Sequence, residues 1–151
     1  MSDAALIESL ETMFRQVNTA IYKYGRSILA GMQVSALQFN ALLTLKEFGS
    51  LTMGELSKQL FTACSTATDL ADRLERAGFV ERVRSHQDRR VVSVNLLPKG
   101  EGIVDLVITE RQVFLGEILK QYTEPEQISL RNALEILTKR IEKADLAMQS
   151  K

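Results

Sequence analysis

The residue types that most often carry out catalysis are scarce in this sequence. It has one cysteine, Cys64, and one histidine, His86. A nucleophile needs a base within hydrogen-bond reach, and a zinc site needs a cluster of Cys, His or acidic ligands at short spacings. Gly100 and Gly102 lack the third glycine of a dinucleotide-binding loop, because Asp105 occupies its place. We therefore expect neither an enzyme nor a bound metal or cofactor.

Basic residues are unevenly distributed along the chain. The formal net charge is zero, but residues 58–99 hold eight Lys and Arg against five Asp and Glu. Arginines gather at Arg82, Arg84, Arg89 and Arg90, opposed in that stretch only by Asp88. A local basic patch on a neutral protein is compatible with binding to DNA phosphates. A charged stretch can equally be a solvated surface.

Short polar side chains follow one face of a predicted helix over residues 63–77. Its other face is apolar at helical spacing, with Ala63, Ala67, Leu70, Ala71 and Leu74. The polar face and its flanks comprise Thr62, Ser65, Thr66, Asp69, Asp72, Arg73 and Arg76. Such a helix fits the major groove of DNA, where base edges can be distinguished. Taken alone, the same face is also explained as solvated helix surface.

Capping boxes, in which Ser or Thr precedes Glu or Gln by three residues, predict where three other helices begin. The pairs are Ser35 with Gln38, Thr52 with Glu55, and Thr123 with Glu126. Before them, residues 4–30 have apolar side chains at three- and four-residue spacings, as in an amphipathic helix. Gly49 is expected to end the second helix. Thr62 is expected to cap the helix over residues 63–77, and Gly78 to end it.

The pattern between these helices changes to that of a β-hairpin. Residues 80–84 and 91–97 are rich in valine, and the polar, basic segment 85–89 separates them. Two long helical patterns follow, over about 98–122 and 123–146. The predicted fold is therefore mainly α with a small β-hairpin wing, the order of a winged helix-turn-helix. A bracing helix and a basic hairpin would hold the recognition helix on DNA.

Four segments together resemble the MarR family of transcriptional regulators. They are residues 51–56, 72–82, 88–92 and 96–100. They are similar to the family's bracing helix, the end of its recognition helix, its wing with an Asp-x-Arg element, and the entry to its dimerisation helices. The resemblance implies one unit over residues 1–151. Residues 35–97 would form the DNA-binding lobe, and residues 4–30 and 98–148 the dimerisation helices.

The resemblance also implies how such a protein works. It would be a homodimer that binds a pseudo-palindromic operator in double-stranded DNA, most often as a repressor relieved by a small molecule or by oxidation. No apolar run approaches the roughly 20 residues of a membrane span, and the acidic N-terminus is unlike a signal peptide. We expect a cytoplasmic protein. The alternative is a winged helix that makes protein contacts only.

The expected DNA contacts come from the second helix, the recognition helix and the wing. They are Gln38, Thr62, Ser65, Thr66, Thr68, Asp69, Arg73, Arg84, Arg89 and Arg90. Gln38 is also expected to cap the second helix. Asp88 and Arg90 would pair and stiffen the wing, or Arg90 would enter the minor groove, or both. Asp69 replaces the basic or neutral residue of many relatives. It could accept a hydrogen bond from a cytosine amino group or pair with Arg73.

Two sites of regulation are candidates. Phe14, Tyr22 and Tyr24 would contribute to an apolar ligand cleft at the junction of the two lobes. Cys64 lies in the first turn of the recognition helix, where the helix dipole favours a thiolate. It is either a redox sensor or a small, semi-buried residue without a chemical role. His86, at the tip of the wing, is expected to be solvated.

Overall fold

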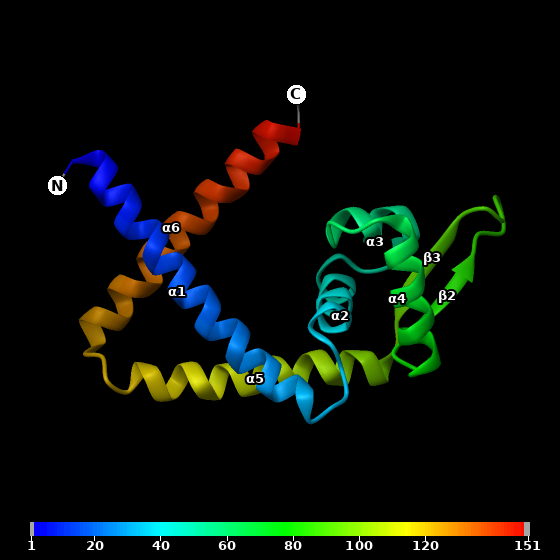
Figure 1. Ribbon diagram of the computed structural model, residues 1–151, viewed down its shortest axis with the longest axis horizontal. Coiled ribbons are helices and arrows are strands. Elements are labelled where there is room, and N and C mark those ends of the chain that lie inside the picture. The colour runs from blue at the N-terminus through cyan, green and yellow to red at the C-terminus, as the bar shows by residue number, and fades with distance from the viewer. Residues whose placement is uncertain (1, 150–151) are drawn as a thin grey trace. The chain divides into compact units, whose positions relative to one another are not determined.

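The computed structural model describes the backbone of residues 2–149 and the side chains of residues 2–146. Its elements, in chain order, are α1 (Asp3–Ala30), α2 (Ala36–Phe48), β1 (Leu51–Thr52), α3 (Met53–Gln59), α4 (Cys64–Arg76), β2 (Val80–Arg84), β3 (Val92–Leu96), α5 (Pro98–Leu119) and α6 (Glu124–Gln149) (Figure 1). This order confirms the predicted winged helix-turn-helix, with a fold that is mainly α.

The chain divides into two compact units. The first ends at Arg111 and the second begins at Gln112, so the boundary lies within α5. The first unit contains α1 to α4, the sheet and the larger part of α5, whereas the second contains the end of α5 and all of α6. The assignment of residues 4–30 and 98–148 to dimerisation stays a prediction.

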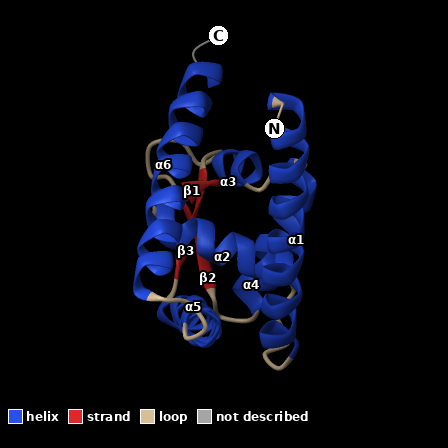
Figure 2. Ribbon diagram, turned by 90° about the vertical axis from the view of Figure 1, so that its left-hand side faces the viewer, coloured by secondary structure: helices blue, strands red, loops and turns tan. Residues whose placement is uncertain are grey.

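A small antiparallel sheet with strand order β1-β3-β2 belongs to the first unit (Figure 2). β2 and β3 form the predicted hairpin, in which Val80 pairs with Leu96 and Arg84 with Val92. The sequence did not indicate β1. It has only two residues, and Thr52 is also the N-cap of α3. β1 pairs with the outer edge of β3 and ties the beginning of α3 to the wing.

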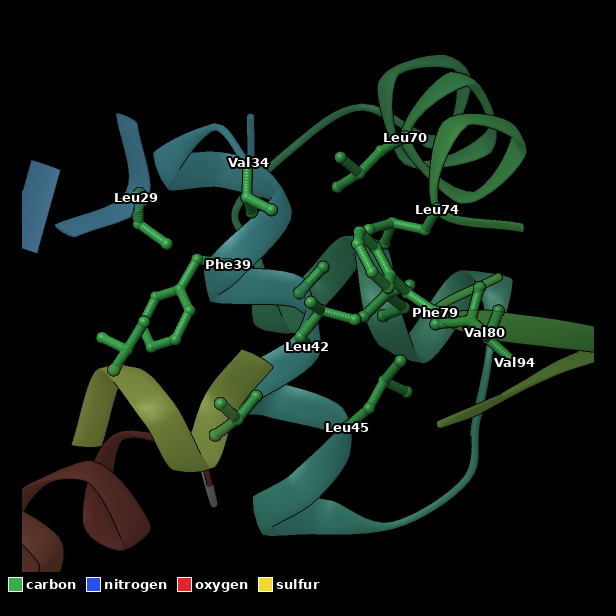
Figure 3. Packing of buried hydrophobic residues seen from close by; sticks show 14 residues of the cluster. Leu29, Val34, Phe39, Leu42, Leu45, Leu70, Leu74, Phe79, Val80 and Val94 are labelled. Atoms are coloured by element: carbon green, nitrogen blue, oxygen red, sulfur yellow. The ribbon is translucent and has the colours of Figure 1, made fainter. Parts of the chain in front are cut away.

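The core of the first unit fixes which way α4 faces. Leu42 of α2, Leu56 of α3, Leu74 of α4 and Val94 of β3 are each 0% exposed and belong to one cluster. Figure 3 shows Leu70 and Leu74 directed from α4 into this cluster. Burial of such side chains is the main stabilising term in folding. Because this side of α4 is buried, the opposite side must face outward.

Two of the three predicted capping boxes are complete. Ser35 with Gln38 and Thr52 with Glu55 each form both reciprocal hydrogen bonds. At the third, the Glu126 carboxylate accepts hydrogen bonds from the backbone N–H and from the hydroxyl of Thr123, both at 2.8 Å. These two bonds lower the pKa of Glu126. The threonine hydroxyl therefore donates to the glutamate, where a capping box would have it accept from the backbone.

The predicted cap of α4 is wrong. Helix α4 begins at Cys64 after Ala63, whose side chain makes no capping hydrogen bond. The Thr62 N–H donates to the carbonyl of Ser57 at 3.0 Å, so Thr62 belongs to the end of α3. Its Oγ1 is buried and has no hydrogen-bond partner among the described residues. The preceding helix thus determines the orientation of Thr62.

Candidate nucleic-acid interface

Helix α4 presents the polar face that the sequence predicted. Ala67, Leu70, Ala71 and Leu74 are buried. The exposed residues along the other side include five of the expected DNA contacts, which are Ser65, Thr66, Thr68, Asp69 and Arg73. Most of these side chains are short, so the helix backbone could lie deep in a major groove, within reach of base edges.

Two interactions within α4 modify this face. The Thr68 hydroxyl donates a hydrogen bond to the carbonyl of Cys64 at 2.9 Å. Arg73 pairs with Asp69 at 3.1 Å, with about two-thirds of each side chain exposed. An ion pair this exposed contributes little to stability. A base contact of Asp69 stays a prediction, and this weak pair with Arg73 does not prevent one.

The wing carries exposed arginines on a stiffened turn. The Asp88 carboxylate accepts hydrogen bonds from the Arg90 backbone N–H at 3.0 Å and from its Nε at 3.2 Å. Arg84 Nη1 donates to the carbonyl of Arg89 at 3.1 Å. The predicted pairing of Asp88 with Arg90 is confirmed. The Arg90 side chain is nevertheless 92% exposed, so its pairing does not hide it from DNA.

An ion-pair cluster that the sequence reading missed joins the wing to α4. Arg82 of β2 pairs with Asp72 at 2.6 Å and with Glu75 at 3.1 Å, and its backbone N–H also donates to Glu75 at 2.9 Å. The side-chain and backbone bonds from Arg82 lower the pKa of Glu75. Arg82 and Arg84 alternate with Val83 and therefore share one face of β2, so their spacing alone did not distinguish the ion-paired arginine from the exposed one.

Gln38 and Thr62 have structural contacts within the DNA-binding lobe. Gln38 Oε1 accepts the Ser35 N–H at 2.8 Å, which confirms its capping role at α2. Thr62 directs its Oγ1 inward. A contact of either residue with DNA stays a prediction, and the inward hydroxyl of Thr62 argues against one in the arrangement seen here.

The three residues expected to form a ligand cleft have separate surroundings. Phe14 lines a hollow on α1 together with Ile7 and Leu10. Tyr22 lines another hollow of about 420 Å³, which lies between α1 and the beginning of α2. The Tyr24 hydroxyl donates to the carbonyl of Glu110 at 3.4 Å. A cleft that combines all three residues stays a prediction.

Comparison with known proteins decides the family. The sequence matches the MarR family over residues 34–92. The HTH-type transcriptional regulator YsmB of Bacillus subtilis (strain 168) is 42% identical over 120 residues, which cover 80% of this chain and 82% of that protein. The solved structure of a MarR family protein from Bacillus stearothermophilus is 38% identical, covers 94% of this chain and 99% of that chain, and superposes with a TM-score of 0.85. The chain belongs to the MarR family.

Membership of the MarR family makes the protein a DNA-binding, helix-turn-helix transcriptional regulator and confirms that it is not an enzyme. The transcriptional repressor MprA of Escherichia coli (strain K12) is a more distant relative. It is 28% identical over 120 residues, which cover 78% of this chain and 68% of that protein. Among residues 2–149 no helix is long and apolar enough to cross a membrane.

Cys64 is the remaining candidate of this MarR-family regulator. It is the first residue of α4 and is exposed, so the expectation of a semi-buried side chain is wrong. Its Sγ lies 3.6 Å from the hydroxyl of Ser57. The role of Cys64 as a sensor stays a prediction.

Proposed function

We propose that the protein is a homodimeric repressor that places α4 in the major groove of a pseudo-palindromic operator and is released from it by a small molecule. The observation that carries this proposal is that α4 and the neighbouring wing both present exposed residues suited to DNA. The outward face of α4 holds short polar residues, and the adjacent wing holds Arg84, Arg89 and Arg90. Arg82 links them through Asp72 and Glu75. They can therefore meet DNA as one surface.

Dimerisation is supported by the apolar side chains that helices of both units leave exposed. In the first unit, α1 exposes Leu6, Ile7, Leu10, Met13, Phe14, Val17 and Ile21. In the second unit, α6 exposes Ile128, Leu130, Leu134, Ile136 and Ile141. Rows of exposed apolar side chains mark interfaces in soluble proteins. Two copies would present two α4 helices, so the operator should have two half-sites about one helical turn apart.

Repression and ligand release rest on different observations. The relative MprA is named a repressor, and a dimer bound across a promoter would exclude the polymerase. The hollow beside Tyr22 is lined largely by apolar side chains, among them Leu29, Val34 and Leu37. A ligand there releases DNA only if it binds the DNA-incompetent state more tightly than the competent state.

Selection from a randomised DNA library tests operator binding. We expect an inverted repeat, and an affinity that falls steeply with salt because bound phosphates release counterions. Light scattering should give a mass of about twice the 16.9 kDa of one chain. A monomer at micromolar concentration would contradict the dimer. A protein-interaction module would give neither an enriched repeat nor salt-sensitive binding.

A second candidate for the releasing signal is oxidation of Cys64. The observation that favours it is the exposure of this thiol at the beginning of α4. An oxidised sulfur there would change the first turn of the helix that we place on DNA.

A further inference from the structure

Phe61 stands out in the turn between α3 and α4. Its side chain is 97% exposed, far more than the other exposed aromatic residues of the described chain. Its backbone φ is +52°, in the left-handed region that L side chains other than Asn and Asp rarely adopt. A large apolar residue is therefore held in an unfavourable conformation and also left in water.

The cause of the conformation is the way in which α3 ends. The Phe61 N–H donates to the carbonyl of Lys58 at 3.2 Å, and the Thr62 N–H donates to Ser57 at 3.0 Å. This pair of bonds is a Schellman motif, which places the residue after the C-cap in the left-handed region and usually has glycine there. Helix α4 ends in the same motif, with Gly78 at that position and φ of +76°.

The two motifs differ in what occupies the left-handed position. Glycine adopts it without steric cost, as at Gly78. At position 61 phenylalanine adopts this conformation at a steric cost, and its ring remains exposed. Residues held in strained backbone conformations are concentrated at functional sites. The fold of α3 and α4 does not need an aromatic ring here, so the ring is available for an external contact.

The surroundings of Phe61 indicate what the contact is. Thr62 turns its Oγ1 inward, whereas the exposed residues nearby in the chain include Lys58, Gln59 and Ser65. A protein-docking site needs an apolar patch of hundreds of square ångströms, and a single ring within polar neighbours does not supply one. DNA matches this arrangement better, because its phosphates attract lysine and its thymines offer an isolated methyl group.

We infer that Phe61 packs against a thymine C5-methyl group in the major groove and so extends base recognition beyond α4. This inference rests on the proposed placement of α4 on an operator. The thymine methyl is the apolar group that distinguishes bases in the major groove, and Phe is among the side chains that contact it. Only three residues separate Phe61 from Ser65 of α4, and Phe61, Ser65 and Thr66 are all exposed.

The variant Phe61→Gly separates the two roles of this position. Glycine relieves the left-handed backbone, so the variant should melt at the same temperature as the wild type or higher. It also removes the ring, so affinity for the selected operator should fall by at least about fourfold, the worth of one buried methyl-sized group. Phe61→Asn, which tolerates the same conformation, should behave similarly. Phe48→Ala, at the exposed aromatic that ends α2, is the matched control and should leave affinity unchanged.

Replacing single thymines of the operator with deoxyuridine removes only the methyl group. The wild type should lose about fourfold affinity at one thymine in each half-site, and Phe61→Gly should lose none there. Equal effects of deoxyuridine on the wild type and on Phe61→Gly at every thymine would overturn this inference and leave the proposed operator binding intact. Failure of the wild type to select any sequence would overturn both.

Discussion

The region from β1 to β3 and the end helices use the same amphipathic periodicity in opposite ways. In the first region, α4 buries its apolar side completely, with Ala67 and Leu74 0% exposed. In the end helices, Ile7 of α1 and Ile136 of α6 are 67% and 63% exposed. The first region is complete within one chain and turns polar residues outward. The end helices turn apolar residues outward, which the proposed dimer would bury.

Truncation of equivalent side chains in the two regions should sharpen this contrast most. Leu74→Ala removes a fully buried side chain and should lower the free energy of unfolding by about 3 kcal/mol through lost burial and a cavity. Ile7→Ala truncates an exposed side chain of the same size. Its effect should depend on protein concentration, because it weakens association. Chemical denaturation at two protein concentrations measures both. If the loss of unfolding free energy in Leu74→Ala also depended on protein concentration, the two regions would not differ in the way described.

The outer face of α4 gives the next largest effect. Asp69→Asn keeps the shape of the side chain, removes its charge and adds a donor. Non-specific DNA binding should strengthen, and discrimination at one operator position should relax by about 1–3 kcal/mol. Selection from a randomised operator library measures the preference. An unchanged consensus would mean that Asp69 only pairs with Arg73, as it does without DNA.

Which features could be predicted from the sequence depends on whether the interactions that determine them are local. Periodicity and capping residues predicted the helices and the wing, because hydrogen bonds between residues three apart and side-chain alternation are local properties. Thr62 was misplaced because the end of α3, and not the beginning of α4, determines its orientation. The contacts of Arg82 were missed because they join different elements. Phe61 gave no local signal, since its importance appears only from its exposure and its φ.

Exposed basic side chains of the two regions should differ in how much they contribute to DNA binding and to its salt dependence. Arg89→Ala should weaken binding to all sequences alike and reduce the slope of log affinity against log salt by about 0.9 for a lost phosphate contact. Arg84→Ala should do the same. Lys139→Ala, which removes an exposed lysine of α6 that pairs with Glu135, is the control and should leave the slope unchanged. A changed base preference in Arg89→Ala would show that Arg89 does not contact a phosphate.

The link between α4 and the wing should give a smaller, pH-dependent effect. The pKa of Glu75 lies below its ordinary value of 4.5 in the folded protein, because of its bonds with Arg82. A lowered folded pKa stabilises the fold at pH values above the unfolded pKa, and this contribution is lost as pH falls through the folded pKa. Since Glu75 is partly exposed, we expect about 0.5 kcal/mol. Arg82→Gln should lose the side-chain part of this contribution while its backbone N–H still donates to Glu75, so its stability should fall less than that of the wild type between pH 5 and 3. Parallel curves of unfolding free energy against pH would contradict this role of the bond.

The smallest expected effect is that of peroxide, and it tests in which region the releasing signal acts. If a small molecule acts through the hollow beside Tyr22 on α1, oxidation is unnecessary. Treatment of the operator complex with an organic hydroperoxide should then leave the wild type and Cys64→Ser equally bound. Cys64 is exposed at the first residue of α4, so a reaction there would act directly on the DNA-binding region. Release of the wild type, with Cys64→Ser unaffected and a reductant restoring binding, would make Cys64 the sensor. The DNA-binding region would then contain its own switch, and the end helices would serve assembly alone.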